Sequence, residues 1–219
     1  MWLPFALRIP SFLGWGWNFS RGMETVFANF DGPNYLIVAK SWYDKEVIGR
    51  SFSNPLPLEY YPAHLPLYPA LIWLADWFLP GTWAMLLVTL AGSVMAVGMF
   101  MKLMEEWGVV QKNRLRLAMI FLLFPARWVV VRSVGSPEPW FIFFILATFY
   151  FYRKQRYFYA ALMGVLAQWT KSPAILLFVS LCLYHCYQYR KNFFSRSALR
   201  QLMKSWPILL MPLSVLPLF

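Results

Sequence analysis

Long apolar runs without charge dominate the chain, and the clearest of them lies between Asp76 and Lys102. The segment from Trp77 to Met101 contains no charged residue, and a helix of that length crosses the ~30 Å hydrocarbon core of a bilayer. The pattern predicts an all-α, polytopic transmembrane helical bundle of about six to seven spans. The further expected spans are Leu115 to Val131, Pro139 to Tyr152, Tyr157 to Thr170, Pro173 to Tyr189, and Trp206 to the C-terminus.

Some of these helices are expected to be shorter than the membrane is thick. The segments 139–152 and 157–170 have fourteen uncharged residues each. At ~1.5 Å per residue they reach only part of the way across, unless flanking side chains snorkel or the helices line a wet cavity. A further apolar piece from Leu65 to Leu79 begins with prolines and includes Asp76, and we expect it at the interface or re-entering from it.

The composition supports a membrane protein. Hydrophobic residues make up 60% of the chain and charged residues 13%, whereas soluble domains are roughly 45–50% apolar and about 25% charged. So few charges cannot cover a water-facing surface, which excludes a soluble domain and a disordered chain. With two cysteines the chain is no disulfide scaffold either. The net charge of +11 then indicates Lys- and Arg-rich cytoplasmic loops, and we expect no nucleic-acid partner.

Alternating the spans across the membrane separates the charges. The loops at 102–116, 153–156 and 190–204, with Arg8, hold thirteen of the twenty Lys and Arg residues and only two acids. The remaining loops hold seven basic and seven acidic residues. The positive-inside rule places the first set in the cytoplasm. We therefore interpret 1–219 as one integral-membrane module in which residues 20–66 form an external catalytic loop.

Both ends of the chain are atypical. Met1 to Trp17 is apolar, but its prolines, glycines and Arg8 do not suit a spanning helix or a secretory signal. The sequence ends at Phe219 inside an apolar run, so we expect the module to be incomplete at its C-terminus. The absence of cysteine pairs in the external loops favours a bacterial plasma membrane over the endoplasmic reticulum.

A short amphipathic helix is predicted between Asn29 and Tyr43. Asp31 would lie at its N-terminal end, followed by Gly32 and Pro33. Two interpretations of Asp31 remain open: a helix N-cap, or a carboxylate that faces an external cleft and acts as a general base. Further on, the three prolines and three tyrosines between Glu59 and Pro69 predict a rigid loop without regular structure. The apolar face of the amphipathic helix would consist of Tyr35, Val38, Ala39 and Trp42.

Together these two segments resemble the first external loop of GT-C glycosyltransferases of the PIG-V type, the mannosyltransferases that add the second mannose of GPI anchors, and their prokaryotic relatives. The stretch Phe30-Asp-Gly-x-x-Tyr-Leu-x-x-Ala39 is similar to the family motif Trp/Phe-Asp-x-x-x-Tyr-Leu-x-Ile-Ala. The stretch His64-Leu-Pro-Leu-Tyr-Pro69 is similar to Phe-Phe-Pro-Leu-Tyr-Pro. The chain departs at His64-Leu65, where two aromatic residues are usual, and at Ser41-Trp42, where Gly-Tyr is common.

The resemblance continues downstream in the same order. Phe124-Pro-Ala126 and Ser136-Pro-Glu-Pro-Trp-Phe141 are similar to the family's Phe-Pro-x-x and Tyr-x-Glu-Ser-Leu-Phe segments. Pro139 replaces the usual Ser there. The helix from Ala160 to Pro173 resembles the family's small-residue helix, with Lys171 where Arg is usual.

The resemblance implies a glycosyltransferase reaction at the external face, in which an acceptor hydroxyl attacks C1 of a sugar carried on polyprenyl phosphate. Such a displacement needs a base near the hydroxyl and positive or amide groups near the departing phosphate. Asp31 corresponds to the family's aspartate and is the candidate general base. Lys171 corresponds to its basic residue and would bind the phosphate, a snorkelling lysine being the alternative. The implied partners are a polyprenyl-phosphate-linked sugar donor (mannose first), a lipid or glycan acceptor, and membrane lipids.

Further candidates complete the expected site. Glu138 is a second catalytic acid that orients the acceptor, a ligand if the enzyme uses a divalent cation, or simply a cap of the next helix; we expect no other cofactor and no dedicated metal site. Arg127 and Arg132 lie near the external face, where a charge near hydrocarbon costs at least ~2.5 kcal/mol, and are candidates for phosphate binding. For Arg132 interfacial anchoring is the alternative. Further candidates for donor-phosphate or substrate binding are His64, Tyr35 and Tyr68.

Other functions stay open. A transporter or lipid flippase also combines broken helices with charges in the membrane, and an inactive remnant or partner subunit is a third interpretation. Cys182-x-x-His185-Cys186 lacks the four ligands of a zinc site, so free thiols are expected. The basic stretch from Arg190 to Lys204 predicts a cytoplasmic interfacial helix attracted to anionic lipid.

Overall fold

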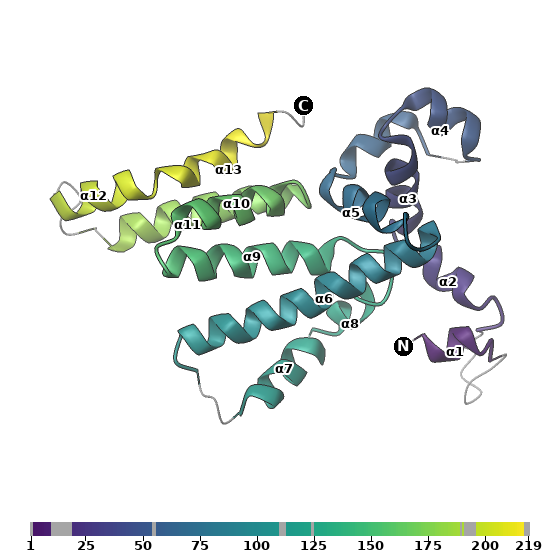
Figure 1. Ribbon diagram of the computed structural model, residues 1–219, viewed down its shortest axis with the longest axis horizontal. Coiled ribbons are helices and arrows are strands. Elements are labelled where there is room, and N and C mark those ends of the chain that lie inside the picture. Colours follow the sequence, from purple (N-terminus) through teal and green to yellow (C-terminus); the bar gives the residue numbers. More distant parts are fainter. Residues whose placement is uncertain are drawn as a thin grey trace. The chain divides into compact units, whose positions relative to one another are not determined.

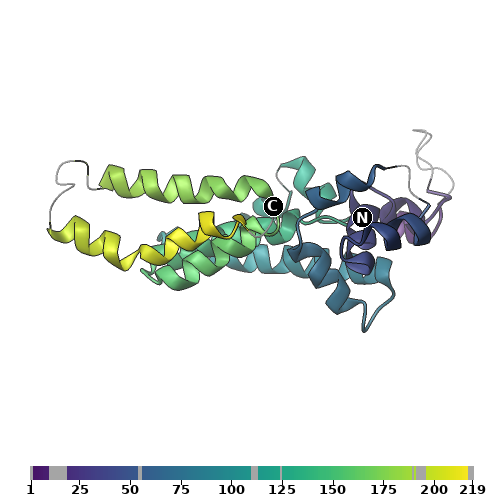
Figure 2. The same ribbon diagram turned by 90° about the horizontal axis from the view of Figure 1, so that it is seen from above.

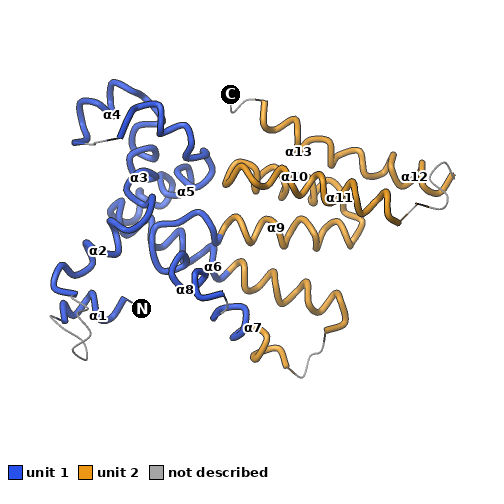
Figure 3. Tube along the Cα trace, turned by 180° about the vertical axis from the view of Figure 1, so that it is seen from behind, with its two compact units in different colours: residues 1–94, 119–139 blue, residues 95–118, 140–219 orange. Residues whose placement is uncertain are grey.

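The structure is a computed structural model of the 219-residue chain, and it describes residues 2–9, 19–53, 56–109, 113–123, 125–188, 190 and 196–216. It is 76% helical, and these described ranges contain no strand, which confirms the all-α prediction. The chain forms two compact units. The first comprises residues 1–94 with 119–139, and the second residues 95–118 with 140–219 (Figure 3).

The first unit is built from short helices (Figure 1). Helix α3 contacts α5 and α4, and α4 contacts η1. Val38, Ile48 and Tyr61, one from each of α3, α4 and η1, form a buried apolar cluster. The elements are α1 (Leu3–Ala6), α2 (Met23–Phe27), α3 (Gly32–Ser41), α4 (Lys45–Ser51), η1 (Leu58–Ala63), α5 (Leu67–Ala75) and α8 (Ala126–Val131).

Helix α3 confirms the amphipathic helix expected in the external loop. Tyr35, Val38 and Ala39 are buried as predicted. Trp42 is not, because the helix ends there: its φ of 49° is left-handed, and its side chain is 47% exposed. The prediction of Trp42 on the buried face is therefore wrong.

The proline-rich segment from Glu59 to Pro69 is more regular than predicted. It contains the 3₁₀-helix η1, with Pro62 inside it, and the first turn of α5. Proline is tolerated in the first turn of a helix because the N–H groups there have no partner within the helix. Pro66 and Pro69 occupy such positions in α5, which lies within the apolar piece expected from Leu65 to Leu79.

Helix α6 (Gly81–Glu106) forms a continuous helix over most of the first predicted span. Within the described ranges it is the one helix long and apolar enough to cross a membrane. It begins after Pro80, whose carbonyl accepts hydrogen bonds from the amides of Trp83 (2.8 Å) and Ala84 (3.0 Å). The helix therefore starts a few residues later than the uncharged run.

The expected span from Leu115 to Val131 is wrong as a single helix. The chain forms α7 (Arg114–Leu123) and α8, with Pro125 in extended conformation between them (φ −74°, ψ 162°). Proline lacks the N–H that a continuous helix needs and disfavours helical backbone in the residue before it. The Phe124 position of the proposed motif lies outside the described residues.

In the second unit, α10 contacts η4, α13 and α11, and Figures 1 and 2 show these elements alongside one another. Helices α9, α10 and α11 lie in three of the predicted segments, whereas the span expected from Trp206 begins as two elements of four residues each, η4 and α13. Tyr189 and 217–219 lie outside the described residues. Helix α10 has only 12 residues. The elements are α9 (Glu138–Arg153), α10 (Tyr157–Gln168), η3 (Ser172–Ala174), α11 (Ile175–Gln188), α12 (Arg196–Lys204), η4 (Trp206–Leu209) and α13 (Leu210–Leu213).

Candidate functional site

The first unit brings together five residues that the sequence singled out, from four separate elements. We name Asp31, Tyr35, His64, Tyr68 and Glu138 the carboxylate–tyrosine cluster. Asp31 precedes α3, Tyr35 lies one turn into it, His64 follows η1, Tyr68 is on α5, and Glu138 begins α9. Both carboxylates lie near enough to Tyr35 to raise its pKa, and the Tyr35 ring contacts the rings of His64 and Tyr68.

Tyr35 is at the centre of the cluster. Its ring lies edge-on to the His64 ring, with centroids 4.7 Å apart, and edge-on to the Tyr68 ring at 5.0 Å. Its side chain is buried, since the residue is 6% exposed. Burial raises the pKa of Tyr35 above its ordinary value, and Glu138 and then Asp31 raise it further. The phenol therefore stays protonated at neutral pH and can donate a hydrogen bond.

Asp31 occupies the N-cap position of α3 without acting as a cap. Its side chain makes no capping hydrogen bond to the first-turn amides, and the residue is exposed. Asp44 in the same loop behaves differently: its Oδ1 accepts hydrogen bonds from the amides of Glu46 (2.9 Å) and Val47 (3.1 Å). The position expected for Asp31 is thus correct, and its carboxylate is not engaged in capping.

His64 is a buried, neutral histidine. Burial lowers its pKa, while nearby Asp31 and the backbone hydrogen bonds of Tyr61 and Tyr60 act in the opposite direction more weakly. Its Nδ1 is buried and has no hydrogen-bond partner in the part of the chain that the structure describes. The Tyr43 hydroxyl, whose pKa burial raises to about 12, donates to the His64 carbonyl oxygen at 2.6 Å. The backbone of His64 is therefore anchored by a hydrogen bond.

Glu138 is connected to Tyr68 through two hydroxyl residues that sequence reasoning missed. The Tyr68 hydroxyl and Thr89 Oγ1 are hydrogen-bonded at 2.6 Å, and the Ser136 amide donates to Thr89 Oγ1 at 3.3 Å. The Ser136 hydroxyl in turn donates to Glu138 Oε2. Thr89, like Thr82 and Ser93, is a hydroxyl residue in a largely apolar run, and that placement was the available signal.

Close backbone packing brings the start of α3 near the loop that precedes Glu138. A Cβ at Gly32 would lie 3.3 Å from the Gly135 carbonyl oxygen and 3.3 Å from Met85 Sδ, and a Cβ at Gly135 would overlap the Met85 side chain. Only glycine fits at Gly135 while Met85 keeps its place. This contact explains how residues about a hundred positions apart in the sequence reach one site.

The three predicted basic residues are divided between the two units. Arg127 is exposed on α8. Arg132, at the end of α8, borders a cavity of about 260 Å³ with Trp2, Ser93 and Ser133, and its Nε is buried without a hydrogen-bond partner among the described residues. Lys171 belongs to the second unit, where it is half-buried at the start of η3. Their role toward a phosphate stays a prediction.

A second polar feature of the first unit was also missed. Lys40 and Asp76 line a cavity of about 300 Å³ between α3 and α5, together with Trp73. The Trp73 ring contacts those of Trp42 (5.9 Å) and Trp77 (5.3 Å). The signal in the sequence was a pair of charges that each border an apolar run.

Within the described ranges, no group of three or more His, Cys, Asp or Glu residues is placed to hold a metal ion. A cation such as Mg²⁺ typically takes one or two carboxylates and completes its ligands with substrate phosphate and water. Asp31 and Glu138 are the cluster residues that a cation-dependent reaction would use.

Comparison of the chain with protein-family models, with curated proteins and with solved structures found no match. The resemblance to GT-C enzymes therefore rests on the quoted motifs alone.

Proposed function

We propose that this chain is a polytopic membrane glycosyltransferase, which moves a sugar from a polyprenyl-phosphate donor to a lipid or glycan acceptor on the external face. Mannose is the sugar that the motif resemblance favours. One observation carries the proposal: Asp31, at the family's aspartate position, is an exposed carboxylate free of capping hydrogen bonds, beside a cluster of buried aromatic side chains.

The cluster supports a direct displacement at the sugar. Asp31 accepts the proton of the acceptor hydroxyl as its oxygen bonds to C1, and the bond from C1 to the phosphate oxygen breaks. Glu138, which accepts a hydrogen bond from Ser136, orients the acceptor. The imidazole of His64 and the phenol of Tyr35 supply hydrogen bonds to the substrate. Lys171, Arg127 and Arg132 are proposed to stabilise the charge on the departing lipid phosphate.

We further propose a multi-pass protein of about six to seven spans, in a bacterial plasma membrane. The composition, the charge separation and helix α6 support this topology. Helices α9 and α11 have 16 and 14 residues, or roughly 24 and 21 Å at ~1.5 Å per residue, short of a ~30 Å core. Flanking polar side chains that snorkel, or a water-filled cavity beside the helices, would complete these spans.

Two matched substitutions in the external loop test the assignment of the base. Asp31→Asn removes the base and should lower sugar transfer by roughly 10²–10⁴-fold, the usual contribution of general-base catalysis. Asp44→Asn should leave transfer nearly unchanged, because asparagine caps helices as well as aspartate does. The measurement is transfer from a polyprenyl-phosphate-linked radioactive mannose in membranes that contain equal amounts of each variant.

Equal activity of the Asp31→Asn protein and the wild type would show that Asp31 is not the base. If the wild type transferred no sugar from any polyprenyl-linked donor, the enzyme class itself would be wrong. Lipid translocation in proteoliposomes would then test the flippase alternative.

A further inference from the structure

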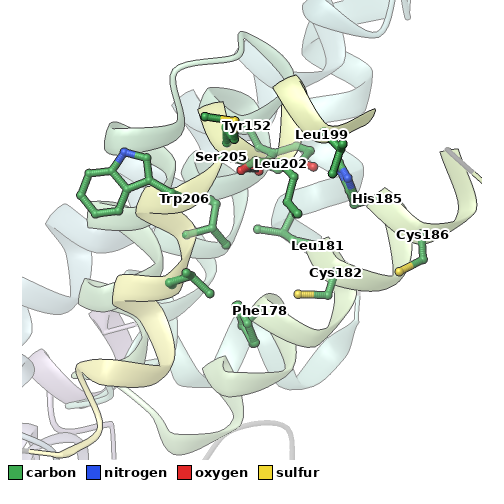
Figure 4. Close-up of a pocket in the computed structure, with 13 residues that line it drawn as sticks. Tyr152, Phe178, Leu181, Cys182, His185, Cys186, Leu199, Leu202, Ser205 and Trp206 are labelled. Atoms are coloured by element: carbon green, nitrogen blue, oxygen red, sulfur yellow. Dashed lines mark hydrogen bonds between the residues drawn. The ribbon is translucent and has the colours of Figure 1, made fainter. Parts of the chain in front are cut away.

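The second unit contains an apolar cavity of about 590 Å³ between α11 and the segment formed by α12 and η4. Figure 4 shows Phe178, Cys182 and Cys186 along α11, facing the segment that carries Leu202 and Trp206. Cavities that hold small ligands measure roughly 300–1,000 Å³. Because the lining is almost wholly apolar, a ligand that fills it must present a hydrocarbon surface.

One wall of this cavity is also the wall of a basic groove. Leu199 and Met203 on α12 line both the apolar cavity and an adjoining groove of about 420 Å³. Arg196, Arg200 and Lys204 complete the groove, at a spacing of four residues that places them along one side of the helix. Helix α12 contains no acidic residue, so its positive charge is not neutralised from within.

We propose that this site binds an anionic phospholipid, whose acyl chain occupies the apolar cavity and whose phosphate lies against Arg196 and Arg200. A hydrocarbon chain joined to a negative group matches an apolar cavity and a basic groove that share a wall. The charge separation along the chain places α12 on the cytoplasmic side, where anionic lipids are concentrated. The site does not depend on the proposed sugar transfer, whose candidate acids Asp31 and Glu138 belong to the first unit.

The two cysteines of the chain can report whether this site is occupied. Cys182 and Cys186 are its two cysteines, both are free and exposed, and both line the apolar cavity. An acyl chain in the cavity would cover these thiols and slow their reaction with N-ethylmaleimide.

The experiment uses the full chain in nanodiscs of phosphatidylcholine, alone or mixed with phosphatidylglycerol. We expect phosphatidylglycerol to slow thiol modification. In the double variant Arg196→Gln/Arg200→Gln that protection should disappear, because the loss of two charges near the membrane weakens binding by about thirtyfold. Arg196→Lys/Arg200→Lys keeps both charges and should keep the protection. Lys102→Gln/Arg116→Gln removes the same charge from exposed positions on α6 and α7, and should also keep it.

Three outcomes would overturn the proposal. Equal protection in neutral and mixed nanodiscs would indicate ordinary surrounding lipid. Protection that survives in Arg196→Gln/Arg200→Gln would show that the basic groove does not hold the headgroup. Slow modification in detergent without any phospholipid would show that protein closes the cavity.

Discussion

At the scale of the residue, His64 is the most informative group of the candidate site. Its imidazole is 3% exposed and lies between the rings of Tyr35 and Tyr60, with centroid distances of 4.7 Å and 5.2 Å. Burial lowers its pKa more than the Asp31 charge raises it. The folded protein therefore holds His64 neutral at a pH where the same residue in the unfolded chain is already charged.

This difference predicts a loss of stability in mild acid. The His64 pKa is lower in the folded state than its unfolded value near 6.5, so its contribution to stability is complete above about pH 6.5. That contribution is lost as the pH falls from there toward the folded pKa, because the unfolded chain binds the proton first. The unfolding temperature of the purified protein should fall over this range, and less steeply in His64→Gln.

A matching slope in wild type and His64→Gln would contradict the assignment. His185→Gln is the second comparison, because it replaces the other of the two histidines of the chain and keeps His64.

At the scale of the element, the contact between α3, α6 and the loop before α9 assembles the site. Met85 on α6 is fully buried, and its side chain lies against Gly32 and Gly135. The same region of α6 carries Thr89, which joins Tyr68 to Ser136. A change in this contact would therefore shift Asp31 and Glu138 relative to each other as well as destabilise the unit.

We predict that Gly135→Ala destabilises the protein by about 1–3 kcal/mol, the usual cost of overpacking. The added Cβ would overlap the side chain of Met85, which is fully buried and would have to repack. Gly49→Ala is the control: a Cβ there meets nothing within 4 Å, so it should not destabilise. Thermal unfolding in detergent measures both.

The double variant Gly135→Ala/Met85→Ala tests the cause. If the Met85 side chain is the obstacle, the two changes will cost less together than the sum of their separate costs. Additive costs would place the strain of Gly135→Ala elsewhere.

At the scale of the whole molecule, the proposed orientation in the membrane rests on the distribution of charge among the loops. In the predicted topology, an ion pair between Lys154 and Glu106, at 2.5 Å, joins two cytoplasmic loops. Arg114 and Glu105 form a second ion pair within one of these loops. The loops expected on the other side hold seven basic and seven acidic residues, and the candidate base lies in one of them. The side on which each loop lies can be measured without knowledge of the reaction.

Two single-cysteine proteins should label from opposite sides. In a Cys182→Ser/Cys186→Ser background, Gly49→Cys should react with a membrane-impermeant maleimide in intact cells. Asn113→Cys should react only after permeabilisation, because its loop belongs to the Lys- and Arg-rich set. Both positions are exposed, so access to the side chain does not limit either reaction. Labelling in the reverse order would invert the topology and remove Asp31 from the external face.

Part of the fold followed from local pattern. The run without charge predicted α6, and apolar spacing predicted α3 with Tyr35, Val38 and Ala39 on its buried face. Errors occurred where one residue overrides a pattern: Pro125 divides an apolar run into α7 and α8, and the left-handed Trp42 ends α3. A hydropathy pattern carries no information about backbone geometry.

The sequence by itself determined the helical class, the grouping of Lys and Arg in alternate segments between apolar runs, and the position of Asp31 at the start of a helix. These features depend on composition and on neighbours within a few turns. Only the tertiary structure decided that Asp44 caps its helix while Asp31 does not, and that Thr89 and Ser136 connect Tyr68 with Glu138. The physical reason is that both features depend on more than neighbouring residues. A capping hydrogen bond depends on the direction that the side chain takes. A chain of hydrogen bonds between distant segments forms only when packing, such as that of Met85 against Gly135, brings the segments together.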